Sequence, residues 1–388
     1  MSVDPVSYLL ICYSYPPVLG GSEIEAQRVS AALQERGHRV KILCAGGDPM
    51  PPLTHWVDPC GVPVQLIGGR WPPRLRGYAF ALGVAWTLWK ERDNYQIAYF
   101  LMQGLQLATG VPVAGLLGKR IVMKFSCSGL ITQMTESLSG RLELRFLKRW
   151  ATRILVLNPG MTQEAIAVGL DPERLGWMPN PVDTDVFYSC TSSEREQRRQ
   201  ELNIAPETPL VVFVGRLDTQ KELPWLLGAF ARVVKERPRA TLVLVGDGPL
   251  RAQIVQMAHD LEIDRNLILA GRLDSGGVLK WLHASDVFTM VSAVEGLPCS
   301  LIEAMSAGLP ALVSEIPAHT QLVETEIHGL VTPMGNLEEI ARGLIRLLDD
   351  AELRARMGVA ARQRILDHYA TNHVVTCYET LFREVLAS

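Results

Sequence analysis

The chain has 388 residues, of which 48% are hydrophobic and 20% charged, and its formal net charge is −3. This composition argues against a disordered or fibrous protein, because such chains are poor in apolar residues or rich in clustered glycine and proline. The length suits two α/β domains that each bury a core of their own.

Cysteine usage and the apolar stretches bear on the compartment. The seven cysteines are far apart and form no C-x-x-C pair, so the sequence predicts neither a zinc site nor a redox couple. The N-terminus lacks the features of a secretory signal. The longest apolar stretches, 78–89 and 105–117, fall short of the ~20 residues that cross a bilayer. We expect a cytoplasmic protein, with the inner face of the membrane as an alternative location.

The first half begins with a strand, a helix and a second strand. Residues 8–13 are an apolar run of strand length, and a Pro-Pro-x-x-Gly-Gly loop and a helix follow them. Gly37 ends that helix, and residues 40–44 form the next strand, an order typical of parallel sheets. Further strands are predicted over 97–102, 120–125 and 154–157. Residues 1–182 are therefore predicted to form one doubly wound, Rossmann-like domain.

The link between the halves is predicted at residues 178–187. Pro179 and Pro181 oppose helix continuation there, and a charged, helix-like stretch follows at 193–202. A second Rossmann-like domain is expected over 183–364. Residues 365–388 are expected to form a terminal helix or two that pack back on the first domain.

Three strands of the second half end in glycine. The β-rich runs 210–214, 241–245 and 266–270 lead directly into Gly215, Gly246 and Gly271. Ligands of open parallel sheets bind beyond the carboxyl ends of the strands, where glycine lets the backbone approach a phosphate. For any single glycine, a tight turn explains the residue equally well.

The most informative stretch runs from residue 291 to 305. Glu295 lies in a loop and Glu303 inside the following helix, where Pro298 suits the first turn. The backbone N–H groups of residues 299–301 can meet an anion such as a diphosphate. One glutamate can accept hydrogen bonds from sugar hydroxyls and the other can hold a ribose, although two ordinary surface acids would have the same spacing.

Two cations follow the first strand of the second half. Arg216 and Lys221 lie at the mouth of the same predicted sheet. A transferase that expels a nucleoside diphosphate must neutralise negative charge on the leaving oxygens, and fixed cations do so.

At these motifs the chain resembles the retaining glycosyltransferases of GT-B architecture, often called family four. The resemblance rests on the following blocks: Gly-Arg-Leu from Gly215 towards Lys221, Val-Gly-Asp-Gly-Pro at 245–249, Glu-Gly-Leu-Pro-x4-Glu-Ala at 295–304, Ala-Gly-x-Pro at 307–310, Asn-Pro-Val-Asp at 180–183, and the pair Gly20-Gly21. It implies two facing Rossmann-like domains with a donor site between them.

The resemblance also implies roles for single residues. Arg216 and Lys221 would bind the donor diphosphate, and Glu303 the donor ribose. Glu295 would hold the donor sugar with the backbone of Gly296 and Leu297. The remaining donor-binding candidates are Gly21, Gly215, Gly246, Cys299, Ser300 and Leu301. The implied donor is a UDP- or GDP-sugar, with no cofactor, no metal and no nucleic acid involved. The leaving phosphate would take the acceptor's proton.

Two places depart from the family pattern. Family members often carry a histidine in the first domain where this chain has Ser126, so Ser126 and Lys124 are the acceptor-side candidates. Residues 316–319, Ile-Pro-Ala-His, replace the paired glycines of many relatives. The histidines show no metal-ligand grouping and are assigned no role.

The expected function is sugar transfer to a glycan, lipid-linked or small-molecule acceptor, for example in cell-envelope polysaccharide or glycoconjugate synthesis. The alternatives are a nucleotide-sugar epimerase of the same architecture and a catalytically silent sugar-nucleotide-binding protein. An aromatic stretch with flanking cations is compatible both with packing inside the first domain and with contact at a membrane interface. It comprises Trp71, Tyr78, Phe80, Trp86 and Trp89, with Arg70, Arg74, Arg76 and Lys90 beside them.

Overall fold

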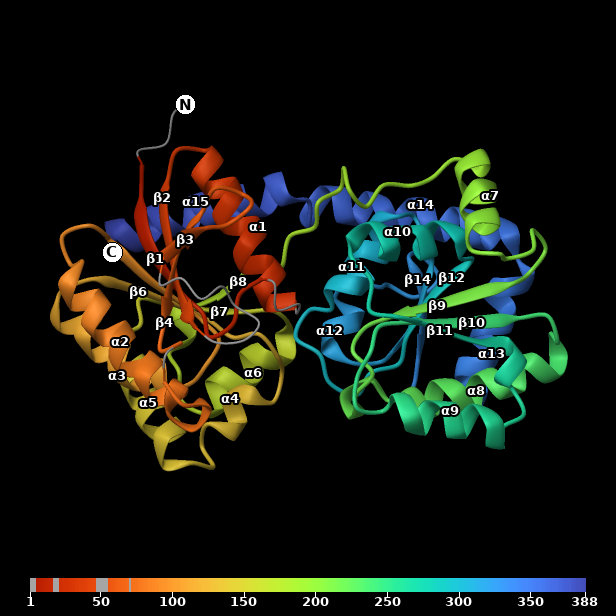
Figure 1. The fold of residues 1–388 in the computed structure, drawn as a ribbon, viewed down its shortest axis with the longest axis horizontal. Helices are drawn as coiled ribbons and strands as arrows, with labels where there is room; N and C mark the ends of the chain where they lie inside the picture. The colour runs from red at the N-terminus through yellow and green to blue at the C-terminus, as the bar shows by residue number, and fades with distance from the viewer. Residues whose placement is uncertain (1–4, 17–20, 47–54, 70) are drawn as a thin grey trace. The chain divides into compact units, whose positions relative to one another are not determined.

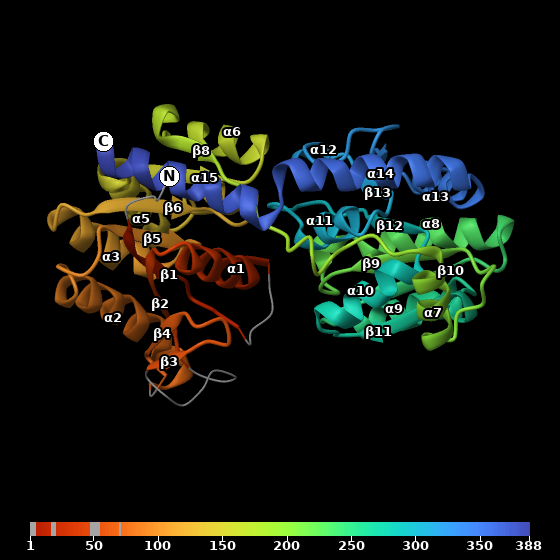
Figure 2. The same cartoon turned by 90° about the horizontal axis from the view of Figure 1, so that it is seen from above.

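The computed structural model describes residues 5–16, 21–46, 55–69 and 71–388. Gly20 and Arg70, which the sequence analysis singled out, lie outside these residues. The chain divides into two units: unit 1 comprises Met1–Pro181 and Thr371–Ser388, and unit 2 comprises Val182–Ala370. The expected boundaries were residues 182 and 364. Each unit is an α/β layered structure with a largely parallel sheet, as Figures 1 and 2 show.

The sheet of unit 1 has the strand order β3-β4-β2-β1-β5-β6-β7-β8, in which β3 runs antiparallel to β4 and the other pairs are parallel. The strands are β1 (Ser7–Ile11), β2 (Arg39–Ala45), β3 (His55–Val57), β4 (Pro63–Ile67), β5 (Ile97–Leu101), β6 (Arg120–Lys124), β7 (Arg153–Val156) and β8 (Leu175–Trp177). All the strands predicted in this half are present within one or two residues. Strands β3, β4 and β8 were not predicted.

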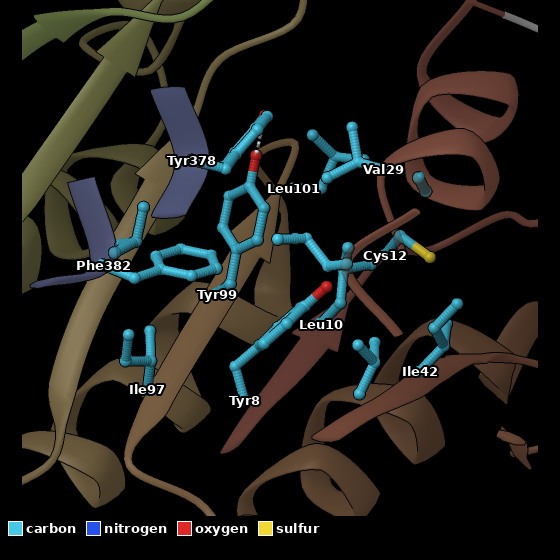
Figure 3. Packing of buried hydrophobic residues seen from close by; sticks show 14 of the residues in the cluster. Tyr8, Leu10, Cys12, Val29, Ile42, Ile97, Tyr99, Leu101, Tyr378 and Phe382 are labelled. Atoms are coloured by element: carbon cyan, nitrogen blue, oxygen red, sulfur yellow. Dashed lines mark hydrogen bonds between the residues drawn. The ribbon is translucent and has the colours of Figure 1, made fainter. Parts of the chain in front are cut away.

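Helices cover both faces of the unit 1 sheet. They are α1 (Gly21–Glu35), α2 (Arg76–Lys90), α3 (Leu105–Leu116), α4 (Leu130–Gln133), α5 (Leu138–Trp150), α6 (Pro159–Ala167) and α15 (Thr371–Ala387). One face carries α1 and α15. Figure 3 shows Tyr378 and Phe382 of α15 packed against Tyr8 and Tyr99 of the sheet. On the other face, Gly110 of α3 lies against the ring of Phe100.

Unit 2 contains a fully parallel sheet in the order β11-β10-β9-β12-β13-β14. Its strands are β9 (Leu210–Val214), β10 (Thr241–Val245), β11 (Leu267–Gly271), β12 (Val287–Met290), β13 (Ala311–Ser314) and β14 (Gly329–Thr332). Because β9 and β12 lie at the centre, the chain reverses its direction of strand addition there. In open α/β sheets such a reversal point is where ligands bind.

The helices of unit 2 also form two layers. They are α7 (Ser192–Glu201), α8 (Leu223–Glu236), α9 (Arg251–Asp260), α10 (Ser275–Ala284), α11 (Cys299–Ser306), α12 (Pro317–Thr320), α13 (Leu337–Asp349) and α14 (Ala351–His368). Figure 1 shows α8, α9 and α13 on one face of the sheet and α10, α11 and α14 on the other. The terminal helical region was expected from residue 365, but α14 already begins at Ala351, because a run rich in Ala, Arg and Leu favours helix. The prediction of two doubly wound domains is confirmed.

Candidate functional site

The carboxyl ends of β9 and β10 approach each other closely in unit 2. The N–H of Gly215 donates to the carbonyl of Val245 at 3.0 Å. Gly246 has φ 141°, and a Cβ atom there would lie 1.9 Å from the carbonyl oxygen of Gly215. Only glycine fits this contact. The two strand ends therefore present a bare backbone edge directly beside Arg216.

Arg216 is an exposed cation held by a buried acid. Its Nε donates to Oδ2 of Asp218 at 2.7 Å, and the arginine side chain is 69% exposed. Asp218 is buried, and its Oδ1 has no hydrogen-bond partner among the described residues. The Nε contact restrains the guanidinium group, while most of the arginine side chain stays exposed to solvent. An anion can therefore bind a guanidinium that is already oriented.

Lys221 and Glu295 form an ion pair at the same sheet edge. Lys221 Nζ lies 2.5 Å from Oε1 of Glu295, and both side chains are largely buried, with 15% and 11% exposed. The N–H of Ala293 donates to the carbonyl of Gln220 at 3.0 Å, which joins the two loops that carry the pair. An ammonium group has three hydrogens. Lys221 can therefore keep Glu295 in place and still donate to a phosphate oxygen.

His319, to which the sequence analysis assigned no role, lies in this electrostatic environment. It is fully buried, and burial lowers its pKa to about 4, with opposing influences from the nearby charges of Glu295 and Lys221. Its Nδ1 lies 3.0 Å from the carbonyl oxygen of Ser314. Because a carbonyl only accepts, Nδ1 carries the hydrogen and Nε2 is an acceptor. Nε2 has no partner within the described part of the chain.

Glu303, which follows Glu295 in the sequence, lies one turn inside helix α11 and is buried. The sequence analysis expected the backbone N–H groups of residues 299–301 to be available to an anion, and this does not hold for Leu301. The N–H groups of Leu301 and Ile302 both bond to the carbonyl of Pro298, at 3.1 and 3.2 Å, and the Leu301 side chain belongs to the core. Leu301 therefore has no spare backbone donor for an anion. Cys299 and Ser300, at the first turn and half-buried, are the candidates that remain at this end.

The acceptor-side candidates lie in unit 1. Lys124 is fully buried and forms an ion pair with Glu25, and its Nζ also lies 3.2 Å from Asn180 Oδ1 and 3.3 Å from the Tyr378 hydroxyl. Its ammonium group is thus enclosed in the interior and does not face an acceptor. Ser126, two residues later, is half-buried in the loop after β6. A helix begins at Gly21, which is exposed, and its approach to the donor stays a prediction.

No group of three or more His, Cys, Asp or Glu side chains in the described ranges is arranged to hold a metal ion. None of the described helices has the length and apolar character needed to cross a bilayer.

Family models match both halves of the chain. Residues 194–364 match the model described as "Glycosyl transferases group 1", and residues 19–186 match "Glycosyltransferase Family 4". Together the two matches leave only the termini and a short segment between the halves uncovered.

Known proteins resemble the chain over most of its length. It is 24% identical to the N-acetyl-alpha-D-glucosaminyl L-malate synthase of Bacillus anthracis over 383 residues, covering 97% of this chain and 96% of the relative. It is 28% identical to an Escherichia coli UDP-Gal:alpha-D-GlcNAc-diphosphoundecaprenol alpha-1,3-galactosyltransferase over 250 residues, covering 62% of this chain and 63% of the relative. Among solved structures, Anabaena HepE in complex with UDP and glucose has a TM-score of 0.81 at 19% identity, covering 98% of this chain and all of that one (100%).

Proposed function

The chain belongs to the group 1 glycosyltransferases and has their GT-B fold, and on that premise we propose that it is a retaining, metal-independent hexosyltransferase with a UDP-sugar donor. The acceptor is a glycan, lipid-linked or small-molecule hydroxyl compound of cell-envelope or glycoconjugate synthesis. The comparisons do not favour an epimerase or a silent binding protein, because the matching families and the relatives named above are transferases or synthases of glycosides.

One observation carries this proposal: two cations, Arg216 and Lys221, are held in place by Asp218 and Glu295 at the carboxyl edge of the sheet. Both cations are oriented before any ligand arrives. Charges fixed in this way stabilise a developing anion without reorganising during the reaction. A departing nucleoside diphosphate is such an anion.

In the proposed reaction, the bond between the sugar C1 and the diphosphate oxygen breaks as charge grows on that oxygen. Arg216 and Lys221 neutralise the charge, and Glu295 accepts hydrogen bonds from sugar hydroxyls. A bond then forms from the acceptor oxygen to C1 on the same face. The acceptor's proton passes to an oxygen of the leaving diphosphate, so no protein nucleophile takes part.

The preference for UDP over GDP is supported by the solved neighbours that contain UDP. It can be tested by thermal melting with UDP, GDP and ADP, because a ligand that binds only the native state raises its stability, by about 2.7 kcal/mol at 100 times Kd. We expect a rise with UDP. A rise of the melting temperature with GDP alone would indicate a GDP-sugar as the donor. No rise with any nucleotide would contradict the proposed function.

A separate assay of turnover tests the role of Lys221 with the variant Lys221→Ala. We expect turnover, measured as UDP release, to fall about 100-fold or more, because a preorganised charge next to the leaving oxygen is lost. Lys235→Ala, an exposed lysine on α8, is the matched control and should keep its rate. A normal rate in Lys221→Ala with an unchanged melting temperature would contradict the assignment of Lys221 to the site.

We further propose that unit 1 rests on an anionic membrane surface through α2. Phe80 is buried against the domain, whereas large apolar side chains at intervals of three and four residues are exposed along the other side of the helix and the turn before it. They are Trp71, Leu75, Tyr78, Leu82, Trp86 and Trp89. We call this set the α2 stripe. Arg74, Lys90 and Arg92 lie beside it and are exposed, which suits acidic lipid headgroups.

A further inference from the structure

A pocket of about 190 Å³ lies in unit 1 where β5 and β6 end. It is much larger than the ~30 Å³ share of one water and smaller than the ~300 Å³ typical of drug-sized ligands. Its polar lining comprises Gln103, Gly104, Gln133, Ser137, Ser139 and Glu143. The size suits one ring of a ligand, and the position is the edge of an α/β sheet at which ligands bind.

The pocket is shaped by the close approach of α5 to the segment before it. A Cβ atom on Gly140 would lie 2.3 Å from the carbonyl oxygen of Met134, so a side chain there would push the helix away. The Ser137 hydroxyl accepts from the N–H of Gly140 at 3.0 Å and fixes the start of the helix. Glu143, one turn later, is thereby directed from α5 to the pocket wall.

Glu143 is an unusual wall residue because it is a carboxyl group that is almost fully buried. Burial raises its pKa, and a backbone hydrogen bond from Gly104 opposes that rise. No ion pair to Glu143 is found among the residues that the structure describes. An acid buried without a cation costs stability, and such groups are concentrated at functional sites.

A purely structural role for Glu143 would be to bind the N-terminus of α3, where Gly104 contributes no side-chain cap. That role uses only part of a carboxylate's capacity, since its two oxygens accept about four hydrogen bonds. Gln103 adds a second unsatisfied group to the same wall, because its buried Oε1 has no partner among the described residues. Gln103 Oε1 thus lacks a donor, and Glu143 can accept more hydrogen bonds than the one from Gly104.

We propose that this pocket is an acceptor subsite that holds a neutral or amino-substituted polyhydroxylated ring, such as a terminal sugar or a cyclitol. The inference rests on the proposed function and specifies its acceptor. Glu143 and Gln103 accept hydrogen bonds from ring hydroxyls, while the Gln133 amide and the hydroxyls of Ser137 and Ser139 can donate to ring oxygens.

The charge of the pocket lining disfavours an anionic group in this subsite. The lining residues include neither Lys nor Arg, and Glu143 would repel a carboxylate or a phosphate. Arg141, the neighbouring cation on α5, is exposed and donates to the carbonyl of Thr135 at 2.7 Å. A phosphate or lipid portion of an acceptor would therefore lie outside the pocket.

Binding can be measured on the full chain by saturation-transfer NMR, without any turnover. The neutral probes are methyl α-D-glucopyranoside, methyl α-D-mannopyranoside and myo-inositol, and the anionic probes are L-malate and glycerol 3-phosphate. We expect saturation of at least one neutral ring and none of the anions. In Glu143→Gln, where an N–H donor replaces one acceptor oxygen, we expect binding at least about tenfold weaker.

Two further variants separate the subsite from folding. Ser139 is exposed, so Ser139→Leu should obstruct the pocket without unfolding unit 1 and should abolish ring binding at an unchanged melting temperature. Glu136→Gln, the same substitution at an exposed position nearby, should bind like the native chain. Native-like binding in both Glu143→Gln and Ser139→Leu, or saturation of the anions alone, would overturn the proposal. UDP-induced melting shifts report on unit 2, so a normal UDP shift without ring binding rejects this subsite alone.

Discussion

His319 has a buried environment that its local sequence does not reveal. Its neutral form is held by the Ser314 carbonyl, and its pKa of about 4 lies below the ordinary value of 6.5. Between pH 4 and pH 6.5, His319 binds fewer protons in the folded state than in the unfolded state. The stability that His319 contributes is therefore complete above pH 6.5 and is lost as the pH falls towards 4.

We predict that His319→Asn reduces the acid sensitivity of unit 2. The asparagine amide can replace Nδ1 as donor to Ser314, and the titrating ring is removed. From pH 7 to pH 5 the native ring costs about 2 kcal/mol of unfolding free energy, and the variant should be spared that loss. The measurement is the melting temperature at both pH values. His259→Asn, at an exposed position on α9, should behave like the native chain, and an equal acid shift in His319→Asn would refute the prediction.

Single residues of the proposed donor site were predictable to different degrees. Strand ends and motif spacing placed Arg216, Lys221 and Glu295 at one sheet edge, and their role in binding a donor stays a prediction. His319 was missed because it follows a different strand, β13, and only the fold brings it near Glu295. Lys124 was placed towards the acceptor, since no local pattern reveals that Glu25 and Tyr378 enclose it.

Helix α2 is an element with two different apolar sides. The side that includes Phe80, Val84 and Leu88 is buried, and the α2 stripe is exposed. Arg92 lies 5.3 Å from the ring centre of Trp89 and keeps a cation beside the apolar surface. Monomeric soluble proteins seldom expose a contiguous surface of this kind without a partner.

We predict that Trp86→Ser combined with Trp89→Ser lowers binding to vesicles that contain phosphatidylglycerol by tenfold or more, because each large side chain contributes about 1.5–3 kcal/mol when it leaves water. Co-sedimentation measures the effect. Binding of the native chain should weaken with salt and should be poor to phosphatidylcholine alone. Val359→Ser, an exposed apolar position on α14, is the control. Equal sedimentation of the double variant would exclude the α2 stripe as the contact.

The elements that the sequence revealed are those with strong local signals. The strands that lead into Gly215 and Gly246 were predicted with their exact bounds, because a β-branched run ends in glycine. Strand β3 has only three residues, His55–Val57, and its strand character comes from antiparallel pairing with β4. Pairing between segments cannot be read from local periodicity.

At the scale of the whole molecule, unit 1 is completed by the last segment of the chain. Val374, Tyr378 and Phe382 of α15 are fully buried in its core, and the Tyr378 hydroxyl lies 2.9 Å from that of Tyr99 (Figure 3). Each such side chain contributes about 1.5–3 kcal/mol. Their sum is comparable with the 5–15 kcal/mol that typically stabilises a domain.

We predict that a chain ending at Ala370 loses the cooperative melting transition of unit 1 but retains that of unit 2, including its response to UDP. Differential scanning calorimetry with and without UDP measures both. Removing only Ala387 and Ser388, which are both exposed, should leave both transitions intact. Two intact transitions after truncation at Ala370 would show that α15 is dispensable for unit 1.

The same arrangement governs the order of folding during synthesis. The ribosome makes residues 1–181 first, yet their core lacks α15 until residues 182–370 have also been made. At about 5–20 residues per second, that interval lasts on the order of ten to forty seconds. Throughout it, the apolar surface that α15 later covers stays open on the nascent chain, while the inserted unit is already long enough to fold. Unit 1, most of which is made before unit 2, is thus completed after it.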